Sequence, residues 1–194
     1  MDNLRTKLIV VSALSLSIFL GQGIAQDTNA YAFAPTTRLE SFATNTGTVV
    51  IRGSADIGVV SANEGTIALK CREVTEASTG RKELGISVDL NHAPDLRETR
   101  YIDYDELESL IDALKYLNKA DWSITSLNSF DAAITTRSGF RASAFSSRRS
   151  SAIEFAVRTA GSGNPAILLS RDQLAELRGM VEQARTKLDA IRAK

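Results

Sequence analysis

Residues 101–117, YIDYDELESLIDALKYL, carry the strongest helix pattern in the chain. Asp103 stands where an N-cap belongs and Glu106 follows three residues later, which is the spacing of a capping box. Apolar side chains then recur at intervals of three and four residues, so they form one stripe on a helix of about 3.6 residues per turn. The stripe consists of Leu107, Leu110, Ile111, Leu114 and Leu117. A capped amphipathic helix is therefore predicted here.

Residues 167–184, ILLSRDQLAELRGMVEQA, repeat this pattern. A shift of 67 positions lays Ser170 on Asp103 and Gln173 on Glu106. The same shift aligns a second apolar stripe with the first: Leu174, Leu177, Val181 and Ala184. The agreement of cap and stripe predicts a second copy of the same helix, against the alternative that two amphipathic helices resemble each other by chance.

Short β patterns precede the first helix. Residues 48–52 and 57–60 flank Gly53-Ser54, which predicts one bent or bulged strand, or a tight pair of strands. Ile67, Leu69 and Cys71 share one face of a strand over 66–74. Residues 84–90 alternate apolar and polar side chains, the clearest period-2 segment of the chain, and 100–102 can add a short strand.

The second half repeats the order with shorter loops. Residues 127–130 echo 39–42 in sequence, and a hairpin is predicted over 130–145 about Ser138-Gly139. Residues 153–157 alternate again, and 166–169 lead into the second helix. We therefore predict the α+β class, with a duplicated unit of three to four antiparallel strands followed by one helix and the two units packed as one body. The first half spans 39–120 and the second half spans 121–194.

This order of elements resembles the ββββα repeats of the PUR-type and Whirly-type single-strand nucleic-acid binding folds, over roughly residues 39–194. The resemblance lies in element order only, and it implies single-strand nucleic-acid binding. Fold-level likeness does not by itself carry function.

The first 25 residues have the pattern of an export signal. Arg5 and Lys7 precede an apolar run over 8–20, and small residues follow at 23–25. Residues 1–25 are therefore predicted to be a signal peptide of a secreted or periplasmic protein, the alternative being an uncleaved anchor. Residues 26–38 are predicted to be a flexible leader, and no transmembrane segment is expected after signal removal.

Charge and composition bound the partners. Without residues 1–25 the chain keeps 21 basic and 22 acidic residues, and this near-neutral balance argues against nucleic acid as a partner. His92 is the one histidine and Cys71 the one cysteine, so neither a catalytic triad nor a zinc site has a pattern to support it. We expect no metal, no cofactor and a buried Cys71. The acidic cluster over 103–112 is interpreted as helix capping and solvation.

Arginines suggest a ligand-binding surface on the second half. Residues 122–165 contain five Arg and two acids, whereas residues 73–112 are strongly acidic. Strand alternation places the candidate ligand-binding residues outward or at the adjoining turn: Arg137, Arg141, Phe145, Arg148, Arg149 and Arg158. The partner is expected to be an anionic ligand or another protein, including a second copy of the chain.

Three functions follow from these patterns. The first is an exported, non-catalytic binding or interaction module. The alternatives are an envelope enzyme with a carboxylate-based site and, on fold analogy alone, a single-strand nucleic-acid binder. A heptad-like seam over 174–191 serves either intrachain packing or a homodimer.

Overall fold

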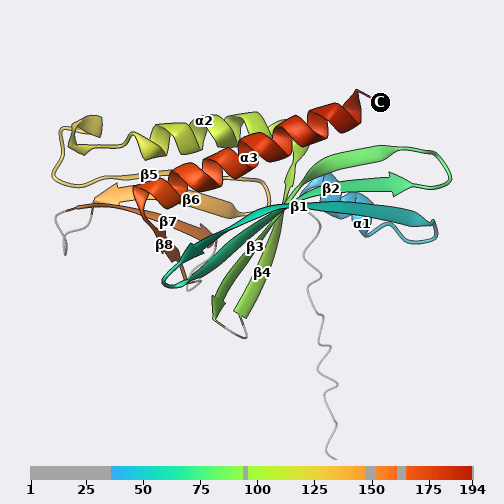
Figure 1. Cartoon of the computed structure of the whole chain (residues 1–194), viewed down its shortest axis with the longest axis horizontal. Helices are drawn as coiled ribbons and strands as arrows, with labels where there is room; N and C mark the ends of the chain where they lie inside the picture. The colour runs from blue at the N-terminus through green and yellow to red at the C-terminus, as the bar shows by residue number, and fades with distance from the viewer. Residues whose placement is uncertain (1–35, 94–95, 147–151, 161–164, 194) are drawn as a thin grey trace, which may run out of the picture. The chain divides into compact units, whose positions relative to one another are not determined.

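The computed structural model describes residues 36–93, 96–146, 152–160 and 165–193. These residues belong to one compact unit, Phe33–Lys194. The unit contains two four-stranded antiparallel sheets, each followed by a long α-helix, as Figure 1 shows. The predicted α+β class with two similar sheet-and-helix units is confirmed.

The first sheet has the strand order β1-β2-β3-β4. Its strands are β1 (Val50–Ala62), β2 (Gly65–Glu76), β3 (Lys82–Ala93) and β4 (Leu96–Asp103). The register of β1 against β2 shifts between Asp56 and Gly58, which leaves one extra residue as a bulge. The prediction of a single bulged strand is therefore confirmed, and the alternative of a tight pair is wrong.

The second sheet has the order β5-β6-β7-β8. Its strands are β5 (Asp131–Thr135), β6 (Phe140–Ser146), β7 (Ile153–Thr159) and β8 (Ile167–Leu169). The predicted hairpin joins β5 to β6. Gly139 has φ 81° in that turn, a left-handed conformation that glycine adopts without strain.

Each of the two long helices packs on the sheet of the other half. Helix α2 (Leu107–Asn118) follows the first sheet but packs on β5 and β6 of the second. Helix α3 (Arg171–Arg192) follows the second sheet but packs mainly on β1, β2 and β3 of the first. The helices also contact each other, and Figure 1 shows them side by side. Separating the two halves would therefore expose the face of each sheet that a helix covers.

Individual contacts show how α3 of the second half packs on the first sheet. Gln173 Nε2 donates to the carbonyl oxygen of Ser61 at 2.6 Å, and Cys71 Sγ donates to the carbonyl oxygen of Ala184 at 3.6 Å. A Cβ on Gly58 would lie 3.3 Å from Met180 Sδ, so glycine lets the helix lie close to β1.

Both helical stripes and the inner faces of both sheets form one apolar core. Ile67, Leu69 and Cys71 are buried, as their shared strand parity predicted. The heptad-like seam of α3 is buried within the same chain, which confirms the intrachain interpretation for its first five members. They are Leu174, Leu177, Val181, Ala184 and Leu188. The face that the sequence offered for a homodimer is thus already covered.

The structure differs from the sequence-based prediction before β1. Residues 1–35 of the predicted signal and leader lie outside the described residues, but Thr37 is buried and caps a short helix, α1 (Arg38–Ala43). Leu39 and Phe42 of α1 pack on Val74 from the outer side of the first sheet. The sequence echo of 39–42 in 127–130 is not a structural one, because 127–130 form a loop before β5.

Within the described ranges, no helix combines the length and the hydropathy that a bilayer crossing requires.

Candidate functional site: the open face of the second sheet

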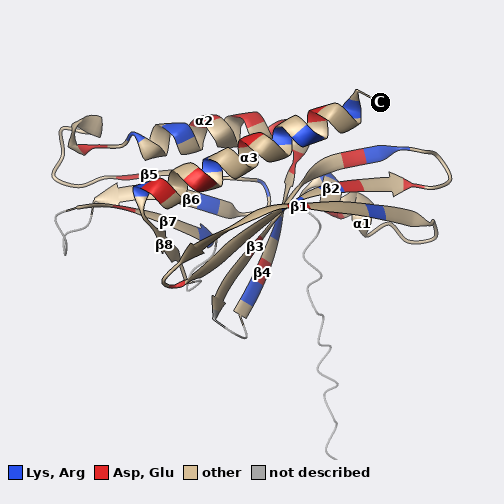
Figure 2. Ribbon diagram, viewed as in Figure 1, with Lys and Arg blue, Asp and Glu red and all other residues tan. Residues whose placement is uncertain are grey.

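Two charged regions could serve as a site: an ionic cluster between the halves and the outer face of the second sheet. Figure 2 shows that acidic and basic residues are spread over the helices and both sheets. The interactions of each Arg therefore decide which region keeps a cation available for a ligand.

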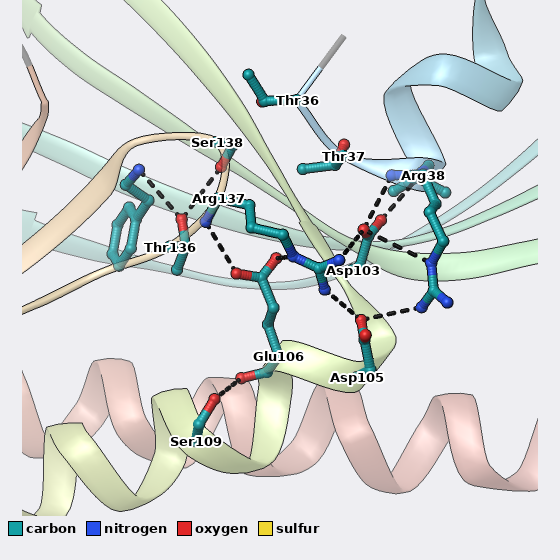
Figure 3. A network of polar contacts seen from close by, with 12 residues as sticks. Thr36, Thr37, Arg38, Asp103, Asp105, Glu106, Ser109, Thr136, Arg137 and Ser138 are labelled. Atoms are coloured by element: carbon teal, nitrogen blue, oxygen red, sulfur yellow. Dashed lines mark hydrogen bonds and ion pairs between the residues drawn. The ribbon is translucent and has the colours of Figure 1, made fainter.

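Arg137 lies in the β5–β6 turn and faces the start of α2. Its guanidinium lies 3.4 Å from Asp103, 2.5 Å from Asp105 and 3.2 Å from Glu106. Its backbone N–H donates to Glu106 at 2.9 Å. Burial alone lowers the pKa of Arg137, but the hydrogen bond to Asp105 and the charges of the three carboxylates outweigh it and raise the pKa. Figure 3 shows the cluster.

Asp103 is the buried centre of this cluster, with 1% of its side chain exposed. It accepts hydrogen bonds from the backbone N–H groups of Arg38 and Leu39, each at 2.9 Å (Figure 3). These are free donors in the first turn of α1, where a carboxylate is favoured by the helix dipole. Arg38 adds contacts to Asp103 and, at 3.0 Å, to Asp105.

The predicted capping box of Asp103 and Glu106 on α2 is wrong. A 3₁₀ turn, η1 (Tyr104–Glu106), precedes α2, and Asp103 makes no side-chain cap to it. Asp103 therefore lies one turn before the α-helix and caps α1 instead, while Glu106 faces Arg137. The matching box of Ser170 and Gln173 on α3 is confirmed.

The ionic cluster holds three parts of the fold together: α1, the end of β4 and the β5–β6 turn. Each of its acids contacts at least one arginine, so the arrangement neutralises charge. Its buried carboxylate, Asp103, already accepts hydrogen bonds from two backbone N–H groups. We interpret the cluster as structural.

The outer face of the second sheet has no covering helix in the described part of the chain. The inner positions Ala142, Ala144, Phe155 and Val157 are buried in the common core. Alternation then leaves a second set on the outer face. The set comprises Asp131, Ala133, Thr135, Arg141, Ser143, Phe145, Glu154, Ala156, Arg158 and Leu168.

A groove of about 620 Å³ lies on this outer face. Ser143 and Ala156 are direct cross-strand partners at its floor, and their small side chains leave the middle of the sheet hollow. Phe145 and Arg158 are among its walls. The lining residues that sequence analysis did not single out are Ser129, Phe130, Asp131, Ser143, Ser146, Ala156, Ala166 and Leu168.

Arg158 is the cation of this groove. It is half-buried, and no hydrogen bond or ion pair joins it to another residue in the described ranges. Other arginines of the second half are engaged: Arg137 in the ionic cluster, Arg171 with the carbonyl oxygen of Ala120, and Arg185 with Glu108. The groove therefore combines an available guanidinium with aromatic and small side chains.

Arg141 is the direct cross-strand partner of Arg158, but it is paired. Its Nη2 lies 3.0 Å from an oxygen of Asp131 and its Nη1 donates to Thr135 at 3.5 Å. Its Nε–H is buried and has no acceptor among the residues that the structure describes.

The structure places three of the six predicted ligand-binding residues on this outer face, Arg141, Phe145 and Arg158, and the last two line the groove. Arg137 belongs to the ionic cluster, and Arg148 and Arg149 lie outside the described residues. Sequence analysis also missed an aromatic pair at the groove. Trp122, which is half exposed, packs edge-on against the groove residue Phe130, with ring centroids 6.2 Å apart. Phe130 belongs to a loop rather than a strand, so period-2 alternation could not place it.

His92 and Cys71 lie apart from this groove. His92 is on β3, with its Nε2 at 3.7 Å from Glu98. Cys71 is a free thiol in the core, and burial raises its pKa. In the ranges that the structure describes, no group of three or more His, Cys, Asp or Glu side chains is arranged to hold a metal ion.

Comparison with protein-family models and with the curated proteins finds no match to the chain.

Proposed function

We propose that the protein is an exported, non-catalytic binding module that takes an acidic polysaccharide on the open face of its second sheet. The observation that carries this proposal is the half-buried Arg158, which lies in a groove of about 620 Å³ without a polar partner in the described ranges. A planar guanidinium of this kind pairs with a carboxylate through two parallel hydrogen bonds.

The other groove residues fit a ring-shaped ligand. Phe130 and Phe145 present flat apolar surfaces, and Ser143 and Ser146 add hydroxyl groups. Ligand sites typically measure about 300–1,000 Å³ and combine apolar walls with a few polar groups. A uronic acid unit offers the matching chemistry, because its ring has apolar C–H faces and its carboxylate can bind Arg158.

The carboxylates of the ionic cluster favour binding over catalysis. A hydrolase of the carboxylate type needs one acid that donates a proton and one that stays ionised, next to the substrate. Asp103, Asp105 and Glu106 each contact Arg137. Each of these carboxylates is thus already paired with an arginine, which suits a structural role.

The proposal of export rests on the N-terminal pattern of residues 1–25. The mature chain is expected to begin near Gln26. Intact-mass measurement of the protein from its native compartment tests this, and a cytosolic species that retains Met1 would contradict it.

The ligand proposal is tested by calorimetric titration with a galacturonate hexamer. Arg158→Ala should weaken binding by about 1.5–3 kcal/mol, or roughly ten- to a hundred-fold, because a hydrogen-bonded charged partner is lost. Arg97→Ala is the matched control, since Arg97 lies on the first sheet and bonds to Asn91. Binding should weaken as salt rises, because the contact is ionic.

Two results would reject the ligand proposal. The first is equal affinity of the wild type and Arg158→Ala for the galacturonate hexamer. The second is equal or tighter binding of a neutral maltohexaose. A preference for a thymidine oligonucleotide over the galacturonate hexamer would point instead to single-strand nucleic-acid binding, in which bases stack on aromatic rings.

A further inference from the structure

Asp131 and Arg141 lie far apart along their strands, yet they form an ion pair. Asp131 is opposite Phe145 and Arg141 is opposite Thr135, so four residues, or about 14 Å at 3.4 Å per residue, separate them along the sheet. The guanidinium of Arg141 nevertheless lies 3.0 Å from Asp131. The side chain of Arg141 must therefore extend along the outer face toward the start of β5.

The floor of the groove is buried. Ser143 is only 7% exposed, although no helix in the described ranges covers that face. Its cross-strand partner Ala156 is similarly buried at 5%, so the small side chains at the middle of the sheet are recessed between the larger ones around them. Asp131 lines the groove on its β5 side, and Arg158 lines it from β7.

The contact between Arg141 and Asp131 is incomplete. It uses one nitrogen of the guanidinium, and within the described part of the chain the buried Nε–H has no acceptor. The Asp131 side chain is 58% exposed, and exposed ion pairs contribute little to stability because water screens them. A ligand carboxylate can therefore replace Asp131 as the partner of the Arg141 terminal nitrogen at small cost.

A second reason favours the exchange. Arg141 and Arg158 are direct cross-strand partners, and like charges in that position repel each other. Asp131 neutralises Arg141 when the groove is empty. A ligand with two carboxylates can neutralise both arginines at once.

We propose that Asp131 is a built-in competitor for Arg141, and that a ligand with two or more carboxylates displaces it and binds Arg141 and Arg158 together. This inference rests on the proposed function, since it concerns the same groove. It assigns Asp131 as the residue that sets the preference for polyanionic over monoanionic ligands.

The test is a double-mutant cycle with the galacturonate hexamer as the probe. Asp131→Asn should tighten binding, roughly two- to five-fold, because a weak competing ion pair is removed. In the Arg141→Ala background the same change should have no effect, because Asp131 then has no Arg141 to compete for. The gain should be smaller for monomeric galacturonate, which cannot occupy both arginines.

Asp56→Asn provides the matched control. Asp56 pairs with Lys70 across neighbouring strands of the first sheet, so this variant makes the same change in net charge elsewhere. It should leave affinity unchanged. Thermal melts of each variant confirm that the folded state is retained.

The possible outcomes separate the two proposals. If Arg158→Ala leaves affinity unchanged, the proposed function is wrong. If Arg158→Ala weakens binding but Asp131→Asn is neutral or also weakens it, only the competitor role is wrong. Equal tightening by Asp131→Asn with and without Arg141 would show a general charge effect, which overturns the competitor role as well.

Discussion

The carboxylate of Asp103 accepts a hydrogen bond from the backbone N–H of Leu39 at 2.9 Å, although 64 positions separate the two residues in the chain. The last residue of β4 thus caps the first turn of α1. Gly85 lies directly opposite Asp103 and makes room for this junction, since a Cβ there would lie 2.3 Å from the carbonyl oxygen of Ile102.

Asp103→Ala should be strongly destabilising. The change leaves the backbone N–H groups of Arg38 and Leu39 without their acceptor, and a buried donor left without a partner costs about 1–3 kcal/mol. Asp105→Ala is the control, because Asp105 is 51% exposed and its loss should cost at most about 1 kcal/mol. Urea unfolding measures both, and equal losses would show that Asp103 has no special role.

Leu110→Ala and Leu177→Ala should cost similar amounts, about 2–5 kcal/mol each, because both side chains are 1% exposed at the centre of a buried stripe. Since each helix covers the sheet of the other half, both variants should still unfold in one transition. Chemical denaturation followed by far-UV circular dichroism and by Trp122 fluorescence checks this. Two separate transitions, or one neutral variant, would contradict the crossed arrangement.

Ser170→Ala should destabilise the protein by about 1 kcal/mol, because the hydroxyl of Ser170 accepts from the N–H of Gln173 in the capping box of α3. Ser170→Gly should cost only about a few tenths of a kcal/mol, since glycine is also a good N-cap. Ser109→Ala, on the exposed side of α2, serves as a control. A loss in Ser170→Gly as large as in Ser170→Ala would argue against capping as the cause.

Cys71 should make stability depend on pH at the alkaline end. Burial raises the pKa of its thiol, so the folded state favours the neutral form. The resulting stabilisation is complete below the unfolded pKa of about 8.5 and is lost as pH rises through the higher folded value. The free energy of unfolding of the wild type should thus fall more steeply above about pH 8.5 than that of Cys71→Ala. Parallel curves would show that the thiol is not desolvated.

Local patterns in the sequence were sufficient for the two long helices and for the core faces of the strands, but not for α1. The parity of Ile67, Leu69 and Cys71 and the alternation over 84–90 depend only on strand geometry, so they predicted the core face of each strand. They did not predict that Ser87 and Asp89 on the other face are buried as well, where they bond to Arg72 and Thr99. The stripes around Leu110 and Leu177 follow in the same way from 3.6 residues per turn. The capping box of Ser170 is equally local, because its partners are three residues apart.

Tertiary structure alone decided which elements meet. Asp103 has the sequence context of a cap for its own helix, but a 3₁₀ turn intervenes and the fold brings the free N–H groups of α1 to its carboxylate. Charge counts alone could not tell which arginines stay available. The fold placed Arg137 against acids of the first half and Arg141 against Asp131, and left Arg158 in the groove. An ion pair depends on distances between residues remote in the chain, and the packing of the two helices across the halves sets those distances.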